Sequence, residues 1–154
     1  MTRVIEGSNA GNGLHIGIAA ARWNQAITDE LLDGALRHLK TLGIGDVTVV
    51  RVAGALELPL ACKKLAESGC HAVVAIGAVV KGETDHYDIV VNESARGLTL
   101  ASLEAGVPIT NAILAVHDYQ LAVDRAGSGQ DNKGAEAVEA AVSSAKVLRE
   151  LGES

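Results

Sequence analysis

The chain of 154 residues is long enough to form one domain with a sizeable hydrophobic core. Hydrophobic residues make up 48% of it but aromatic residues only 2%, and Phe is absent, so the core has to be built from Val, Ile, Leu and Ala. The net charge of -6 and the scattered positions of Lys and Arg argue against a nucleic-acid-binding protein.

Targeting signals and disulfides are not predicted. Residues 1–6 lack the apolar centre of a signal peptide, and no apolar run is long enough to cross a bilayer. We therefore expect a cytoplasmic protein without a membrane partner. Cys62 and Cys70 do not have CxxC spacing, and in that compartment we expect them to be reduced, small apolar core residues.

The first half of the chain alternates predicted strands and helices. Residues 14–20 are typical of a buried strand, and apolar residues then recur at helical spacing between Ile27 and Leu42. Residues 47–52 are the next predicted strand. We expect a second helix with Pro59 in its first turn, where a missing N–H costs little, and with its end near Ser68.

The second half continues this alternation. The saturated apolar run 72–80 is too short to span a membrane and predicts a strand that is buried on both faces. A helix over 88–105 and a strand over 109–116 are expected next. A short helix over 119–125 and an Ala-rich helix over 132–151 complete the predicted elements.

Together these elements predict a single α/β domain over residues 1–154, a three-layer sandwich with a four-stranded parallel sheet. Residues 1–13 are different, because glycines separate a short apolar segment at 2–5 from the core. We expect this N-terminal arm to form a strand that pairs with the sheet edge of a neighbouring subunit.

The most informative segment is the end of the strand 72–80 and the turn that follows it. Ligands of parallel sheets bind beyond the carboxyl ends of the strands, and this turn carries Lys81, Glu83, Thr84 and His86. Backbone N–H groups of such a turn can bind an anion, and imidazole, which titrates near neutral pH, can transfer a proton. The segment favours chemistry on a phosphorylated small molecule. The alternative is a plain strand-to-helix turn with a hydrogen-bonded loop histidine.

Four segments carry a wider resemblance. They are 21–24 with 27–28 (Ala-Arg-Trp-Asn and Ile-Thr), 54–59 (Gly-Ala-Leu-Glu-Leu-Pro), 81–88 (Lys-Gly-Glu-Thr-Asp-His-Tyr-Asp) and 124–127 with 132–134 (Asp-Arg-Ala-Gly and Asn-Lys-Gly). In this order and spacing, over nearly the whole chain, they resemble the lumazine synthase (6,7-dimethyl-8-ribityllumazine synthase) family.

The resemblance implies a transferase of riboflavin biosynthesis. The family condenses 5-amino-6-(D-ribitylamino)uracil with 3,4-dihydroxy-2-butanone 4-phosphate to give 6,7-dimethyl-8-ribityllumazine, phosphate and water, without a metal or an organic cofactor. The resemblance also implies a flavodoxin-like fold and homo-oligomers, either pentamers or icosahedral capsids of twelve pentamers, with active sites between adjacent subunits. Riboflavin synthase is a candidate partner. The short loop between Arg125 and Asn132 is similar to that of capsid-forming relatives.

For the pyrimidine substrate, the resemblance implies that Trp23 stacks on the ring and that Glu57 accepts hydrogen bonds from ribityl hydroxyls. His86 is the implied catalytic residue for proton transfer. The other residues implied in this pocket are Ala55, Leu56, Ala78, Val79, Val80 and, from the neighbouring subunit, Asn111. The alternatives are a core or interface tryptophan and an acid that is merely favoured at a helix start.

For the phosphate, the resemblance implies main-chain contacts from Glu83 and Thr84 and a bidentate contact from Arg125 of the adjacent subunit. Lys133 is a weaker candidate for the same anion. The alternatives are a surface arginine that complements the end of a helix and a solvated lysine at a helix start.

Several positions depart from the family pattern. Asn111 stands where Phe is common, residues 115–118 (Ala-Val-His-Asp) replace a Thr-Thr-acid stretch, Lys81 stands where Arg is frequent, and Ala78 where a hydroxyl residue is frequent. None of these changes removes a group that proton transfer or phosphate release needs. They motivate one alternative function, a non-catalytic flavin or lumazine carrier or shell protein on the same scaffold.

Overall fold

The structure is a computed structural model that describes residues 1–7, 13–127 and 131–152. Its middle layer is a four-stranded parallel sheet in the order β2-β1-β3-β4. The strands are β1 (His15–Ala21), β2 (Asp46–Val52), β3 (Ala72–Val80) and β4 (Ile109–Val116). β1 and β3 are therefore central, while β2 and β4 form the edges of the sheet.

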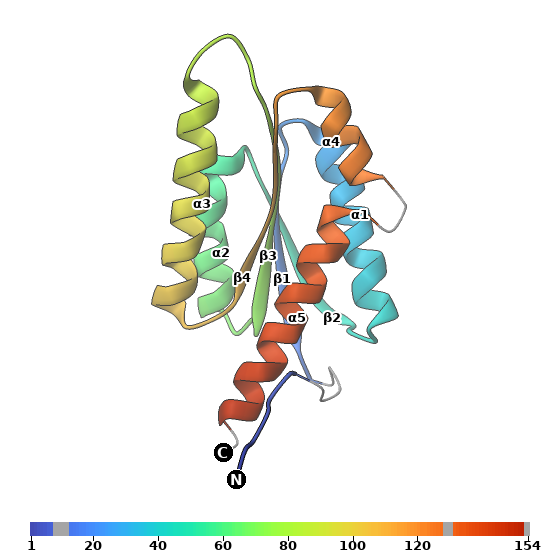
Figure 1. Cartoon of the computed structure of the whole chain (residues 1–154), viewed down its shortest axis with the longest axis vertical. Coiled ribbons are helices and arrows are strands. Elements are labelled where there is room, and N and C mark those ends of the chain that lie inside the picture. The colour runs from blue at the N-terminus through green and yellow to red at the C-terminus, as the bar shows by residue number, and fades with distance from the viewer. Residues whose placement is uncertain (8–12, 128–130, 153–154) are drawn as a thin grey trace.

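Helices cover both faces of this sheet (Figure 1). One face is covered by α2 (Leu58–Glu67) and α3 (His86–Ala105). The other face is covered by α1 (Gln25–Thr41), α4 (Tyr119–Ala126) and α5 (Lys133–Gly152). The predicted three-layer α/β sandwich with a parallel four-stranded sheet is confirmed.

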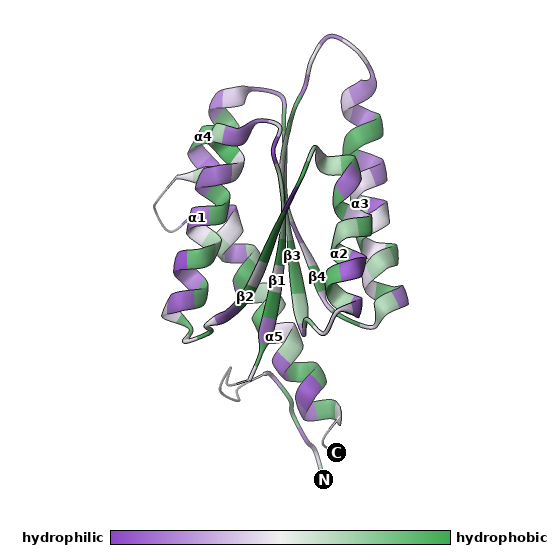
Figure 2. Cartoon of the chain, turned by 180° about the vertical axis from the view of Figure 1, so that it is seen from behind, coloured by the Kyte–Doolittle hydropathy of each residue, from purple (hydrophilic) through white to green (hydrophobic). Residues whose placement is uncertain are grey.

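The core consists of small and branched side chains, as the composition requires. Successive residues of the central strands enter two different clusters: Ile18 packs under α1, α4 and α5, and Ala19 packs under α2 and α3. Val74 and Ala75 of β3 alternate in the same way. Figure 2 shows hydrophobic strands between helices that carry their hydrophilic residues outward. Burial on both faces explains why residues 72–80 form a saturated apolar run.

The predicted bounds of helices and strands agree with the structure to within two residues. β3 spans the predicted residues 72–80, and α2 has Pro59 in its first turn, as expected. α3 begins at His86, slightly before its predicted start, so His86 lies on the first turn of a helix rather than in a loop. The 3-10 turn η1 (Ala55–Glu57), which leads into α2, was not predicted.

The N-terminal arm is described in part, because residues 8–12 lie outside the described ranges. Residues 1–7 do not form a strand in the single chain. Gly7 has a φ of +75° and lies against α5, where a Cβ atom would come within 2.7 Å of the carbonyl oxygen of Ser143. Pairing of the arm with the sheet of another subunit stays a prediction.

Both cysteines are free and buried in the cluster under α2 and α3, which confirms their predicted role as core residues. Burial raises the pKa of the Cys62 thiol to about 12. Burial, and then the charge of Asp46, also raises the pKa of Cys70. Near neutral pH both side chains are therefore thiols, whereas thiolates are the form that reacts with electrophiles.

We expect a thiol reagent to label neither cysteine of the folded protein appreciably at about pH 8. Because the pKa of Cys62 is raised, its thiolate fraction should stay small until the pH approaches about 12 or the chain unfolds. Mass spectrometry of native and denatured samples, labelled in parallel, checks this expectation. Rapid native labelling of Cys62 would contradict its buried position.

Candidate active site

One cavity, of about 450 Å³, opens at the carboxyl ends of β1 and β3, where parallel sheets bind their ligands. We call it the strand-end cavity. The structure brings most of the residues predicted for the pyrimidine pocket together around it: His86, Trp23, Ala55, Leu56, Glu57, Ala78, Val79 and Val80. Its other lining residues are Ala21, Asn24, Gly54 and Val90.

Trp23 follows β1 and is 64% exposed, so it is not a core residue. Its indole packs against the backbone of Gly54, where a Cβ atom would collide with ring atoms Cε3 and Cζ3. The backbone N–H of Trp23 donates to the carbonyl oxygen of Ala53 at 2.9 Å, which joins the turn after β1 to the turn after β2. The indole thus contacts Gly54, and much of the ring remains open to a ligand.

Asn24 lines the strand-end cavity, and sequence reasoning gave it no role. Its φ of 61° is in the left-handed region, which Asn tolerates better than most residues. Its side-chain amide donates a 2.8 Å hydrogen bond to the carbonyl oxygen of Ala78, across 54 positions of sequence. Asn24 therefore ties the turn that carries Trp23 to the end of β3. The sequence feature that could have indicated a role for Asn24 is its position beside Trp23 in the first family-like segment.

The turn between β3 and α3 carries the remaining predicted groups of this region. Residues 81–85 are exposed, and Glu83 and Thr84 lie on this turn without lining the strand-end cavity. The Thr84 hydroxyl accepts a long hydrogen bond, 3.4 Å, from the backbone N–H of His86. Because the turn leads directly into α3, it lies at the end of the helix where N–H groups lack partners within the helix.

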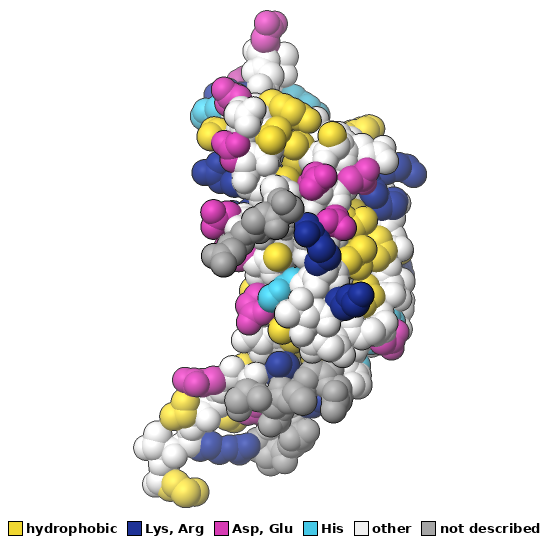
Figure 3. All heavy atoms as spheres, turned by 90° about the vertical axis from the view of Figure 1, so that its right-hand side faces the viewer, with side chains coloured by type: hydrophobic (Ala, Val, Ile, Leu, Met, Phe, Trp, Pro, Cys, Tyr) yellow, Lys and Arg dark blue, Asp and Glu magenta, His cyan; other side chains and the backbone are white. Residues whose placement is uncertain are grey.

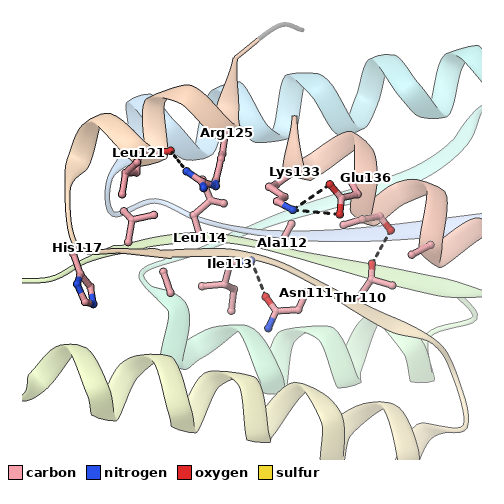
Figure 4. Close-up of a pocket in the computed structure, with 14 residues that line it drawn as sticks. Thr110, Asn111, Ala112, Ile113, Leu114, His117, Leu121, Arg125, Lys133 and Glu136 are labelled. Carbon is pink, nitrogen blue, oxygen red and sulfur yellow. Dashed lines mark hydrogen bonds and ion pairs between the residues drawn. The ribbon is translucent and has the colours of Figure 1, made fainter. Parts of the chain in front are cut away.

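A second cavity, of about 860 Å³, lies beside β4, α4 and α5 (Figure 4). We call it the edge cavity, because β4 is an edge strand of the sheet. Three predicted site residues line it, namely Asn111, Arg125 and Lys133. Of the described residues, none lines both cavities, so a single chain holds the predicted site residues in two separate groups.

Two cationic side chains extend from α4 and α5 towards β4 in the edge cavity (Figure 4). Arg125 Nη1 donates to the carbonyl oxygen of Leu121 at 3.3 Å, and the described residues supply no carboxylate partner for this guanidinium. Lys133 Nζ contacts both carboxylate oxygens of Glu136, at 3.2 and 3.3 Å. Arg125 is therefore the better placed of the two to bind an added anion.

Asn111 and His117 line the edge cavity along β4, the edge strand of the sheet. The Asn111 side-chain oxygen accepts a 2.7 Å hydrogen bond from the backbone N–H of Ile113 and so satisfies a donor of the edge strand. His117 follows β4 directly and lines the edge cavity. Its ring makes an edge contact with Tyr87, the neighbour of His86, with centroids 5.7 Å apart. His117 thus connects the edge cavity with the start of α3.

Charges and candidate metal ligands are dispersed over the described chain. No group of three or more His, Cys, Asp or Glu side chains in the described ranges could hold a metal ion. None of the described helices has the length and apolarity to span a membrane. On the face formed by α1, α4 and α5, Lys and Arg side chains interleave with Asp and Glu (Figure 3).

Comparison with known proteins identifies the family. A family model described as 6,7-dimethyl-8-ribityllumazine synthase matches residues 13–149. The 6,7-dimethyl-8-ribityllumazine synthase of Thermococcus kodakarensis is 46% identical over 152 residues, which are 98% of this chain and 97% of the relative. The proteins of the same name from Thermococcus gammatolerans and Nitratidesulfovibrio vulgaris are 45% and 42% identical, over 98% and 97% of this chain and of each relative. The resemblance predicted from the four segments is confirmed, and the chain belongs to the 6,7-dimethyl-8-ribityllumazine synthase family.

Proposed function

We propose that the protein is a lumazine synthase of riboflavin biosynthesis. It condenses 5-amino-6-(D-ribitylamino)uracil with 3,4-dihydroxy-2-butanone 4-phosphate to 6,7-dimethyl-8-ribityllumazine, phosphate and water. Family membership over almost the whole chain supports this activity. The observation that carries the proposal is the gathering of Trp23, Glu57 and His86 around one cavity at the carboxyl ends of the strands. They supply an aromatic face, a hydrogen-bond acceptor and a proton-transfer group.

The pyrimidine binds in the strand-end cavity. Its ring stacks on the exposed indole of Trp23, and the ribityl hydroxyls donate hydrogen bonds to Glu57. The end of β3, residues 78–80, also lines this cavity. The volume of about 450 Å³ is within the usual range for a small-molecule site. His86 at the rim takes a proton from the attacking amine and returns one to the oxygen that leaves as water.

The ketone phosphate needs an anion site beside the pyrimidine. Backbone N–H groups of Glu83 and Thr84 lie just before α3, whose N-terminal end favours negative charge. The guanidinium of Arg125, which has no carboxylate partner in the described chain, binds the phosphate and stabilises it as it departs. Lys133, already paired with Glu136, adds a weaker positive field.

We propose that two neighbouring subunits complete each active site. In one chain the two groups line different cavities, which supports a site in which the edge cavity of one subunit faces the strand-end cavity of the next. Arg125 then acts on a substrate whose pyrimidine partner is held by the Trp23 and His86 of the neighbour. Asn111, at the open edge of β4, borders the same junction.

The larger assembly is part of the same proposal. It comprises a pentamer, a capsid of twelve pentamers, riboflavin synthase as a partner and a cytoplasmic location. The loop that led us to expect a capsid, residues 126–131, lies partly outside the described residues. The N-terminal arm has two sheet edges available in a neighbour, β2 and β4.

The carrier alternative is not favoured. The departures that motivated it, Asn111 and residues 115–118, belong to β4 and the turn after it and leave Trp23, Glu57 and His86 unchanged. The relatives of this chain bear the name of the synthase.

An absorbance assay with the two substrates tests the proposed function. We expect the lumazine chromophore to form at a rate proportional to protein concentration and well above the rate of the uncatalysed mixture. A carrier would bind the product without accelerating its formation. A rate equal to the spontaneous background at every protein concentration would therefore reject the synthase and favour the carrier.

Binding of a lumazine or of riboflavin is expected to quench the fluorescence of Trp23. The chain has one Trp, so the signal reports this side chain alone, and stacking places the flat ligand against the indole. A fluorescence titration gives the affinity, with equilibrium dialysis as an independent measure of binding. Confirmed binding without quenching would place Trp23 outside the pocket.

A further inference from the structure

Asn132 is a buried polar residue at the junction of three helices. It precedes α5 and is only 2% exposed. Burial of a side-chain amide is unfavourable unless its donors and acceptor find partners. The contacts of this amide therefore indicate what the residue does for the fold.

Every polar atom of the Asn132 side chain has a partner. Its oxygen accepts a 3.0 Å hydrogen bond from the backbone N–H of Ala135, which caps the first turn of α5. Its Nδ2 lies 3.0 Å from the carbonyl oxygen of Ala126 and 3.1 Å from that of Gly127, at the end of α4. The same nitrogen lies 3.2 Å from the carbonyl oxygen of Glu30 on α1. One amide thus joins the end of α4, the start of α5 and the side of α1.

Two glycines leave the space in which the Asn132 amide and the two helices α1 and α5 come close together. A Cβ atom at Gly34 of α1 would collide with the amide of Asn132. A Cβ atom at Gly134 would collide with the carbonyl oxygen of Leu31, so the start of α5 lies directly against α1. These close approaches show that the amide and the two helices are tightly packed, so a change at Asn132 should be felt by the backbone around it.

The residues next to this junction are the two cations of the edge cavity. Arg125 immediately precedes Ala126, whose carbonyl oxygen accepts from Asn132, and Lys133 immediately follows Asn132. Among the described residues, the Arg125 side chain has one hydrogen bond, a long one of 3.3 Å to the carbonyl oxygen of Leu121. Its position therefore depends on the backbone at the end of α4 more than on its own bonds.

We propose that Asn132 is a positioning residue for phosphate binding: it fixes the end of α4 relative to the start of α5 so that Arg125 and Lys133 meet one phosphate. This inference rests on the proposed function. It concerns the edge cavity alone, because none of the described hydrogen-bond partners of the Asn132 side chain lines the strand-end cavity.

Two substitutions separate the two roles of the Asn132 side chain, donating a hydrogen bond at the end of α4 and capping the start of α5. Asn132→Ser keeps a hydroxyl that can cap α5 but loses the donor to α4, and Asn132→Ala loses both. In the assembled protein we expect both variants to raise the inhibition constant of inorganic phosphate and the KM of the ketone phosphate by about 10- to 100-fold, the usual effect of displacing a binding group by about 1 Å. Both variants should lower the unfolding midpoint, because both leave the carbonyl oxygens at this junction without the amide donor, and Asn132→Ala should lower it further because it also loses the cap of α5.

Two readouts exclude a merely structural effect. The affinity for riboflavin, measured through Trp23 quenching, should be the same in Asn132→Ser as in the wild type. Val142→Ala is the matched control: Val142 is a buried residue of α5, 2% exposed, outside the junction. It should lower the unfolding midpoint and leave the phosphate constants unchanged.

Unchanged phosphate constants in Asn132→Ser would overturn the inference, and so would an equal loss of riboflavin affinity. A third contrary result is a change in the phosphate constants of Val142→Ala as large as that of Asn132→Ser. Each of these results presupposes an active wild type. An inactive wild-type protein would reject the proposed function instead, which keeps the two failures distinct.

Discussion

Replacing Arg125 by alanine is expected to remove about 2–4 kcal/mol of transition-state stabilisation, the scale of one anion-stabilising donor. Arg125 lines the edge cavity, and the described residues offer its guanidinium no carboxylate, so a bound phosphate is its natural partner. The loss should appear in kcat/KM for the ketone phosphate at subsaturating concentration, measured by lumazine absorbance.

A second arginine provides the control for a change of charge alone. Arg37 lies on α1 in an ion pair with Asp33, 2.8 Å apart, and lines neither cavity. Arg37→Ala should leave kcat/KM almost unchanged, since exposed ion pairs of this kind contribute little. If Arg125→Ala and Arg37→Ala show the same turnover, Arg125 does not bind the phosphate.

The second large effect is expected for His86→Gln. Glutamine can keep a hydrogen bond but cannot take up and release a proton, so kcat should fall by about 100-fold or more. The KM of the pyrimidine should change little, because Trp23 and Glu57 are retained. Steady-state kinetics over a range of pH measure both constants.

His38→Gln is the matched control for this histidine. His38 lies on α1 and contacts Glu139 at 2.7 Å, away from both cavities. We expect the activity of this variant to equal that of the wild type. A kcat for His86→Gln equal to that of His38→Gln would remove His86 from the proton-transfer role.

The strands of the sheet were predictable because the pattern of hydrophobic residues in the sequence indicates where they begin and end. A run without a single polar side chain, residues 72–80, can be accommodated only where both faces are covered, and it became the central strand β3 with the predicted bounds. Pro59 likewise marked the first turn of α2. The predicted start of α3 was two residues late, and Asp85, which precedes the helix, makes no side-chain capping hydrogen bond.

The polar contacts that hold the site together were not predictable from local sequence. Asn24 bonds to Ala78 and Asn132 to Glu30, across 54 and 102 positions. Such partners are determined by how the helices and strands pack against one another, and the residues next to each asparagine in the sequence do not specify them. Both asparagines occur in family-like segments, but the resemblance did not indicate which hydrogen bonds they make.

The order of the strands helps to separate the predicted site residues into two cavities. The sequence predicts a parallel sheet but not which strand lies at its edge. The order β2-β1-β3-β4 places Asn111 on an open edge, and α4 and α5 hold Arg125 and Lys133 beside it. His86 instead starts a helix that lies against the other face of the sheet. The expectation of a shared site came from the family resemblance, and in the single chain the predicted residues line two separate cavities.

Mixed assemblies of His86→Gln and Arg125→Ala test most directly whether neighbouring subunits complete one site. The two variants carry different affinity tags, are refolded together in equal amounts, and are purified over both tags to secure mixed oligomers. Each variant then supplies the group that the other lacks. In a ring assembled at random, about one junction in four has an intact His86 facing an intact Arg125, so about a quarter of the wild-type activity should return. Activity equal to the mean of the two parent variants would show that each site lies within one chain and would contradict this account.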